Sequence, residues 1–163
     1  MKQEVITAFQ KQIEKERDAS IVYEAISYWC AAREYTGFAD FFKKQSKEEY
    51  EHVEKLAEHL LIRGVQPVLG VLNAPPSHFE NLAQVAETAL AHEQANTRGV
   101  LETLEVAKAS NDYAALNLLN WFVNEQVEEE AWAGRLVTLM SRITSEGGIY
   151  NLDRHIVEDL TGK

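Results

Sequence analysis

Four long rows of apolar residues, spaced at alternating steps of three and four positions, dominate this sequence. That spacing places each row on one face of an α-helix and predicts a bundle in which the rows pack against one another. Each row is interrupted near its middle by Glu, His or Gln. The rows run from Ile6 to Cys30, from Phe38 to His59, from Ala86 to Ala107 and from Ala115 to Ile143.

The interrupting residues are mostly carboxylates at positions that the spacing assigns to the core. They are Glu16, Glu49 with His52, Glu93, and Glu129 with Gln126 one turn before it. A buried carboxylate without compensation is costly or takes up a proton. Because all lie near the middle of a helix, they reach similar heights in the bundle. Four carboxylates carry a charge of about −4, which two divalent cations would balance, so the pattern predicts a dinuclear metal site.

The apolar rows and the Gly and Pro residues between them predict an all-α chain with one domain over residues 1–163. We expect helices at 4–34, 38–64, 79–109, 112–143 and, shorter, 148–161. The segment 65–78 contains all three prolines and spans about 45 Å when extended, which is also the length of a 30-residue helix. It can therefore return along the whole bundle and make the second and third helices parallel. Its apolar residues Val68, Leu69, Val71 and Leu72 suggest burial against a partner subunit.

Composition narrows the classes of function. The formal net charge of −10 disfavours a nucleic-acid partner, because phosphate binding uses clustered Lys and Arg. No apolar run is long enough to span a bilayer, and the N-terminus is too charged for a signal peptide, so we expect no membrane partner and a cytoplasmic location. The single cysteine, Cys30, lies on an apolar row and is expected to be a buried structural thiol.

The metal-binding hypothesis depends on the combination of helices. Glu49-x-x-His52 places a carboxylate and an imidazole on one helix face, but this motif alone is weak. With the other carboxylates it gives an oxygen-rich set that suits Fe(II), Mn(II) or, less selectively, Zn(II). Known di-iron bundles carry two Glu-x-x-His motifs, whereas the fourth helix here has Gln126-x-x-Glu129. The second metal should therefore bind more loosely, as expected of iron in transit.

Four stretches of the sequence resemble non-haem ferritins of the prokaryotic type. They are QSKEEYEHVEKLAEHLLIRG, the Glu16 to Tyr23 spacing with its intervening ASIVY, AHEQ around Glu93, and NEQVEEE in the fourth helix. The resemblance extends from Gln3 into the fifth helix. It implies a ferritin-like four-helix bundle with one long crossover between helices 2 and 3 and a short C-terminal fifth helix.

The resemblance also implies roles for individual residues. Glu16, Glu49 and His52 look like the ligands of a first iron, with Glu49 bridging to a second iron that Glu93 and Glu129 also hold. Gln126 matches a residue that forms hydrogen bonds near the oxygen-binding side. Tyr23 matches a tyrosine beside the centre that can bind a ligand by hydrogen bonding or donate an electron. A tyrosine that only satisfies its own hydroxyl is the alternative.

Further acidic residues match secondary iron positions of the family. Glu48 and Glu125, with Glu129, match a third iron site of some prokaryotic ferritins. Glu51 and Glu54 match positions where related ferritins start mineral growth, and Glu58 extends this stripe by one turn. Ordinary solvated glutamates are the alternative for all of these except Glu129.

The implied function is iron storage with ferroxidase activity. Two Fe(II) ions per subunit would be oxidised by dioxygen or peroxide, and the ferric product would collect inside a homo-oligomeric shell of 24 subunits. A DNA-protecting mini-ferritin and a di-iron oxidase or peroxidase without storage remain alternatives, as does a metal-free structural bundle. No haem is expected, because Tyr50 stands where bacterioferritins carry the haem-binding methionine. One cysteine cannot build the iron domain of a rubrerythrin.

Overall fold

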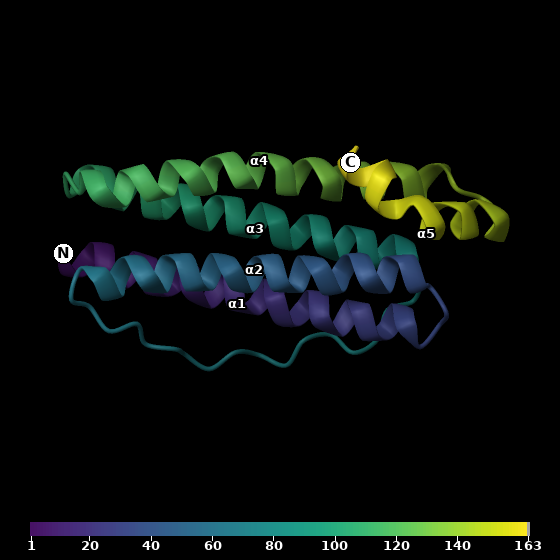
Figure 1. The fold of residues 1–163 in the computed structure, drawn as a ribbon, viewed down its shortest axis with the longest axis horizontal. Helices are drawn as coiled ribbons and strands as arrows, with labels where there is room; N and C mark the ends of the chain where they lie inside the picture. The colour runs from purple at the N-terminus through teal and green to yellow at the C-terminus, as the bar shows by residue number, and fades with distance from the viewer. Residues whose placement is uncertain (163) are drawn as a thin grey trace.

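The computed structural model describes residues 1–162, which form five α-helices (Figure 1). They are α1 (Gln3–Ala31), α2 (Thr36–Ile62), α3 (Leu82–Ala109), α4 (Tyr113–Arg142) and α5 (Glu146–Thr161). The five expected helices are therefore present in the expected order, and the all-α fold class is confirmed.

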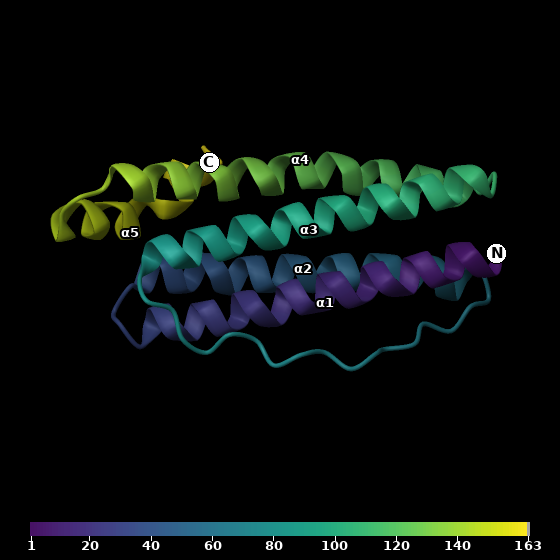
Figure 2. The ribbon, with the colours of Figure 1, turned by 180° about the vertical axis from the view of Figure 1, so that it is seen from behind.

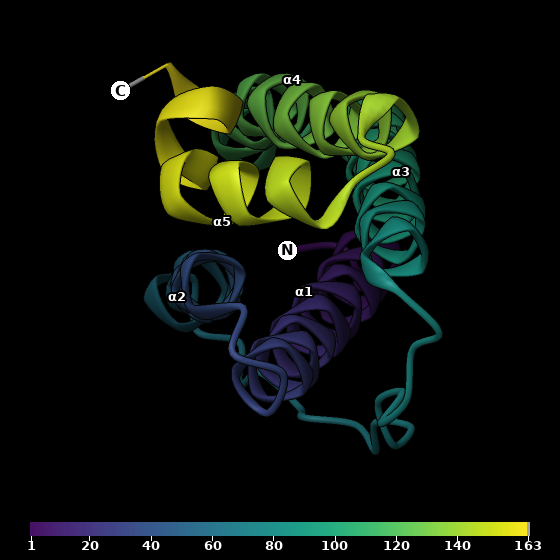
Figure 3. The ribbon, with the colours of Figure 1, turned by 90° about the vertical axis from the view of Figure 1, so that its right-hand side faces the viewer.

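The four long helices form two antiparallel hairpins, α1–α2 and α3–α4, and the crossover runs the length of the bundle between them (Figures 1 and 2). The second and third helices are consequently parallel, as the length of the crossover predicted. The view along the bundle shows α1 beside α3 and α5 lying between α2 and α4 (Figure 3). In packing terms, α1 contacts both α2 and α3, while α5 contacts α2 and α4.

The helix ends differ from expectation by a few residues for local reasons. Helix α1 stops at Ala31 rather than at residue 34, and Glu34 takes the left-handed conformation (φ 62°) in the turn. Helix α2 ends before Gly64, whose φ of 75° lets the Val65 N–H bond back to the Leu60 carbonyl at 2.9 Å. This is a glycine-terminated helix end that satisfies a free carbonyl.

Three helices have an N-cap side chain from their own sequence, and in α4 this is Asp112, which accepts a hydrogen bond from the Ala115 N–H at 3.1 Å. The Asn81 side chain accepts a hydrogen bond from the Gln84 N–H at 2.9 Å, which places the start of α3 at Leu82 rather than at 79. The Ser145 hydroxyl accepts from the Gly148 N–H at 3.2 Å, so α5 begins at Glu146, two residues earlier than expected.

The crossover between α2 and α3 lies against α1. Arg17 Nη1 donates to the Gly70 carbonyl at 3.0 Å, and a side chain at Gly70 would meet Glu14. Val68, Leu69 and Val71 are exposed, whereas Leu72 is half-buried. The expected apolar surface is therefore present over three of the four residues.

The core is divided into two apolar clusters by a polar layer. One cluster surrounds Tyr23, Phe42 and Trp132 near α5, and the other surrounds Phe9, Leu56 and Phe122 at the opposite end. Cys30 is fully buried in the first cluster, as expected. Burial also raises the pKa of its thiol to about 12, which keeps it protonated at neutral pH. No helix within residues 1–162 combines the length and the apolar character needed to cross a bilayer.

Candidate metal centre

The polar layer contains all the residues that interrupt the apolar rows. Glu16 and Glu93 are completely buried, and the most exposed member, Glu129, shows only 8% of its surface. The other members, also buried, are Glu49, His52 and Gln126. Each of these residues lies near the middle of its helix, so the packing of α1, α2, α3 and α4 brings their side chains into one layer.

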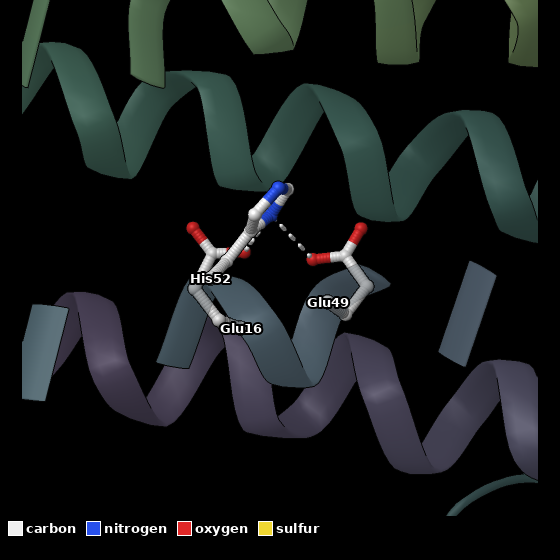
Figure 4. Close-up of side chains that lie close together, drawn as sticks. All are labelled: Glu16, Glu49 and His52. Atoms are coloured by element: carbon white, nitrogen blue, oxygen red, sulfur yellow. Dashed lines mark ion pairs between the residues drawn. The ribbon is translucent and has the colours of Figure 1, made fainter. Parts of the chain in front are cut away.

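Glu16, Glu49 and His52 form the first group of possible ligands (Figure 4). The Nδ1 atom of His52 lies 3.6 Å from Glu16 Oε2 and 3.5 Å from Glu49 Oε2. The imidazole is held in place by edge contacts with Trp121 and Phe122. Three potential ligand atoms from two helices thus face one point.

The second group consists of Glu49, Glu93 and Glu129, so Glu49 belongs to both groups. Glu93 accepts a hydrogen bond from the Tyr23 hydroxyl, and Glu129 accepts one from the Trp132 indole N–H. Gln126 Nε2 lies 3.3 Å from both the carbonyl oxygen and Oε2 of Glu93. The second group therefore contains no histidine, and its carboxylates Glu93 and Glu129 accept hydrogen bonds from Tyr23, Gln126 and Trp132.

Opposite charges lie next to each other in the first group. Burial alone would raise the pKa of Glu16, but the neighbouring His52 and the Gln12 amide lower it below its ordinary value. Burial likewise works to lower the pKa of His52, yet the adjacent Glu16 carboxylate raises it. The two side chains therefore favour an anionic carboxylate beside a cationic imidazole.

The remaining carboxylates favour their protonated forms. Burial, followed by repulsion from Glu16 and Glu93, raises the pKa of Glu49 well above its ordinary value. Burial and the charge of Glu129 raise the pKa of Glu93 to about 8. Burial raises that of Glu129 to about 7, although the Trp132 hydrogen bond opposes this. Burial is the largest cause of all three shifts, and the neighbouring carboxylates add to it.

A groove of about 710 Å³ leads to this layer from the surface between α2 and α4. His52 and Glu129 lie at its base, and the expected acidic stripe Glu51, Glu54 and Glu58 lines it together with Glu48, Glu125 and Glu128. A metal ion could therefore reach the buried layer along a wall of carboxylates.

The structure brings Glu125 and Glu129 together with His52 as a third possible ligand group. Glu48, which the sequence placed in this group, lines the same groove but is engaged by Lys44 at 3.0 Å and by the Gln45 amide. Of the expected third set, Glu125 and Glu129 therefore lie together, whereas Glu48 contacts Lys44 and Gln45.

The residues present fit a pair of divalent metal ions. The buried Nδ1 atom of His52 has no hydrogen-bond partner within residues 1–162, although buried polar atoms are normally satisfied. A metal ion between His52 and the two facing carboxylates would satisfy this atom and balance the charges. Carboxylates with one imidazole suit Fe(II) and Mn(II), as well as Zn(II).

Comparison with known proteins agrees with this site. The family model of the ferritin-like domain matches residues 6–143. The chain belongs to the ferritin family. It is 32% identical to a bacterial non-heme ferritin of Staphylococcus epidermidis over 88% of this chain and 86% of that protein. A bacterial non-heme ferritin of Staphylococcus aureus is 34% identical over 85% of this chain and 84% of its own length.

Solved ferritins have the same fold. An open pore ferritin from the hyperthermophilic archaeon Archaeoglobus fulgidus superimposes with a TM-score of 0.92 at 27% identity, covering 96% of this chain and 97% of the other. An engineered closed form of the same ferritin gives a TM-score of 0.92, with 96% coverage of each chain. These matches confirm the expected four-helix bundle with a short fifth helix.

Sequence reasoning missed three residues that contact the ligand layer of this ferritin. Gln12 and Asn96 donate amide hydrogen bonds to Glu16, and Trp132 donates to Glu129. Asn96 follows Glu93 by three positions, as His52 follows Glu49, so this spacing was a usable signal. Trp132 stands three positions after Glu129 in the same way, but an apolar ring on a core face gives no such signal.

Proposed function

We propose that this protein stores iron and is a ferroxidase. Two Fe(II) ions would bind in the buried layer and be oxidised by dioxygen or hydrogen peroxide, and the ferric product would be kept as mineral inside a shell of 24 identical subunits. The observation that carries this proposal is the sharing of Glu49 between two buried ligand groups. A shared carboxylate places two ions close enough to act on one oxidant molecule.

The ligand residues have distinct tasks in this proposal. Glu16 and His52 hold the first Fe(II), Glu93 and Glu129 hold the second, and Glu49 contacts both. Each Fe(II) gives one electron. With peroxide, two Fe(II), one H₂O₂ and two protons yield two Fe(III) and two water molecules. With dioxygen, the same two electrons and two protons yield H₂O₂.

The difference between the two positions favours storage over a permanent cofactor. The second position lacks an imidazole, and the pKa values of Glu93 and Glu129 lie near or above neutrality, so protons compete with the metal there. A weakly held ion leaves more readily after oxidation. The acidic groove with Glu51, Glu54 and Glu58 offers the path for its entry and exit.

The residues beside the site complete the proposal. Tyr23 and Gln126 contact Glu93 and would orient it as a ligand of the second iron. Glu125 with Glu129 and His52 would form a third iron site on the way to the groove, and Glu48 would join it after releasing Lys44.

The ferroxidase assignment is tested by Fe(II) oxidation under air. We expect Glu49→Ala and His52→Ala to lower the initial rate at least about 10-fold, since each removes a ligand from the buried layer. Glu102→Ala, which removes an exposed carboxylate of α3 that does not line the groove, is the matched control for overall charge. Equal initial rates in the wild type and both ligand variants would contradict the ferroxidase assignment.

Storage is tested separately from oxidation. Repeated additions of Fe(II) followed by electron microscopy and iron analysis should give an electron-dense core in each shell. Rapid oxidation with iron remaining at two or three ions per subunit would instead support a di-iron oxidase or peroxidase without storage. A DNA mobility shift in the same preparation would favour the mini-ferritin alternative.

A further inference from the structure

Among residues 1–162, Asn96 is the one uncharged residue that donates hydrogen bonds to polar-layer carboxylates of two different helices. It lies on α3 one turn after Glu93, and only 2% of its surface is exposed. Its Nδ2 atom lies 3.1 Å from Glu16 Oε2 on α1 and 3.5 Å from Glu49 Oε2 on α2. The amide therefore bridges the two carboxylates of the first ligand group.

The oxygens that Asn96 contacts are the same ones that face His52. His52 Nδ1 lies 3.6 Å from Glu16 Oε2 and 3.5 Å from Glu49 Oε2. The amide group and the imidazole thus approach the same pair of oxygens. By holding these two oxygens together, Asn96 keeps both directed at the point where His52 would bind a metal.

The other oxygen of Glu16 is fixed independently. Gln12 Nε2 donates to Glu16 Oε1 at 2.7 Å. A glycine on α3, Gly99, makes room for Gln12, because a Cβ there would lie 2.2 Å from Gln12 Oε1. Each oxygen of Glu16 consequently receives an amide hydrogen bond, which leaves this carboxylate little freedom to rotate.

We propose that Asn96 is a positioning residue that preorganises Glu16 and Glu49 for the first metal ion. The neutral amide donates to one oxygen of each side chain, so it can hold Glu16 and Glu49 together without placing a competing charge in the site. Residues that orient metal ligands typically change metal affinity by about 10- to 100-fold when they are replaced. This inference rests on the proposed function, since it assumes that the first ligand group binds a metal.

The test is Co(II) binding, followed by its d–d absorption, together with thermal unfolding of the metal-free protein. Asn96→Leu has nearly the same shape without a donor, and Asn96→Ala is the second variant should leucine fail to fold. Thr103→Val is the control. It removes a buried hydroxyl that donates to the Gly99 carbonyl at 2.8 Å on the same helix, but it contacts no ligand.

We expect both Asn96 variants to bind the first Co(II) about 10- to 100-fold more weakly. Thr103→Val should lower the unfolding temperature while leaving Co(II) affinity unchanged. Wild-type affinity in the Asn96 variants, with only the unfolding temperature lowered, would show that Asn96 is merely structural and overturn the inference. Failure of the wild-type protein to bind Co(II) would instead contradict the proposed function itself.

Discussion

Tyr23 and Trp132 are the side chains that distinguish the two halves of the ligand layer at the scale of single residues. The first ligand group contains His52. In the second group, Tyr23 donates a hydrogen bond to Glu93 and Trp132 donates one to Glu129. The two rings also pack edge to face, with centroids 6.1 Å apart. Orientation of Glu93 and Glu129 therefore depends on the apolar cluster that holds these rings.

The Trp132 hydrogen bond should be needed for the second metal ion. Replacing Trp132 by Phe removes the donor to Glu129, so we expect second-site Zn(II) affinity to fall by about 10-fold or more, with first-site affinity unchanged. Competitive Zn(II) titration with a chromogenic chelator measures both. Trp29→Phe is the matched control, because Trp29 is equally buried in the same cluster but contacts no ligand. Equal second-site affinity in Trp132→Phe and the wild type would contradict this.

The raised pKa values of Glu93 and Glu129 predict a pH dependence of the metal-free protein. Both groups are protonated in the fold at pH values where the unfolded chain has lost the proton, so they contribute stability below about pH 4.5 that is lost as the pH rises through 7 to 8. Glu49 and His52, whose pKa values are also raised, act in the same direction. The lowered pKa of Glu16 changes the free energy of unfolding only below about pH 4.5.

Calorimetry of the metal-free protein between pH 5.5 and 8.5 measures this effect. The unfolding temperature of the wild type should fall with rising pH, and that of Glu93→Gln, which keeps the hydrogen-bonding shape without an ionisable group, should fall less. Added Zn(II) should remove most of the decline. An unfolding temperature that rises across this range would show that these carboxyls are ionised in the fold.

The junction of α2 and α5 shows how separate elements complete each other. The N-cap residue of α2, Tyr35, makes no side-chain capping bond, and Asp153 of α5 supplies it by accepting from the Phe38 N–H at 2.9 Å. Gly37 permits this approach, because a Cβ there would lie 1.6 Å from the Asp153 carbonyl oxygen. A capping residue 115 positions away along the chain docks α5 beside the bundle.

Gly37 should accept no side chain. Gly37→Ala places a methyl group into the backbone of α5, so α5 must shift and the Asp153 cap is lost, with an expected cost of at least about 2 kcal/mol. Gly134→Ala is the matched control, since within residues 1–162 nothing lies within 4 Å of its Cβ position and alanine favours a helix there. Thermal unfolding should show a clear loss for the first variant and no loss for the second. Equal unfolding temperatures would contradict the predicted close approach.

The whole molecule combines an acidic groove on one side with an apolar crossover on the other. The groove between α2 and α4 contains Glu51, Glu54 and Glu58, whereas the crossover exposes Val68, Leu69 and Val71. An exposed apolar strip on the side away from the acidic groove favours association through the crossover, which would leave the groove open to cations. This arrangement is consistent with the homo-oligomeric cage of the family.

A charge in the crossover should weaken assembly. Val71 is fully exposed in the single chain, and Val71→Asp would bury a carboxylate if a second copy covers it. We expect sedimentation velocity to show a smaller assembly or a mixture. Asn73→Asp, an exposed neighbour with the same charge change, should assemble normally. Unchanged assembly in Val71→Asp would place the subunit contact elsewhere.

The sequence alone determined the helices and the existence of the polar layer. Apolar spacing and helix-ending residues are local signals, so the five helices were predicted to within a few residues. The positions of Glu16, Glu49, Glu93 and Glu129 on apolar rows can also be read from the sequence. They indicated a polar layer because a buried carboxylate is costly without compensation. The resemblance to non-haem ferritins implied a role as a metal ligand for each of these residues.

Only the tertiary structure decided which of these groups share a point and what holds them there. The amide bridge of Asn96 and the Asp153 cap join residues that are tens of positions apart or more. Such contacts depend on how far helices slide and rotate against one another, and no local spacing records that. The open groove between α2 and α4 has the same origin, since it exists only where two packed elements leave a space.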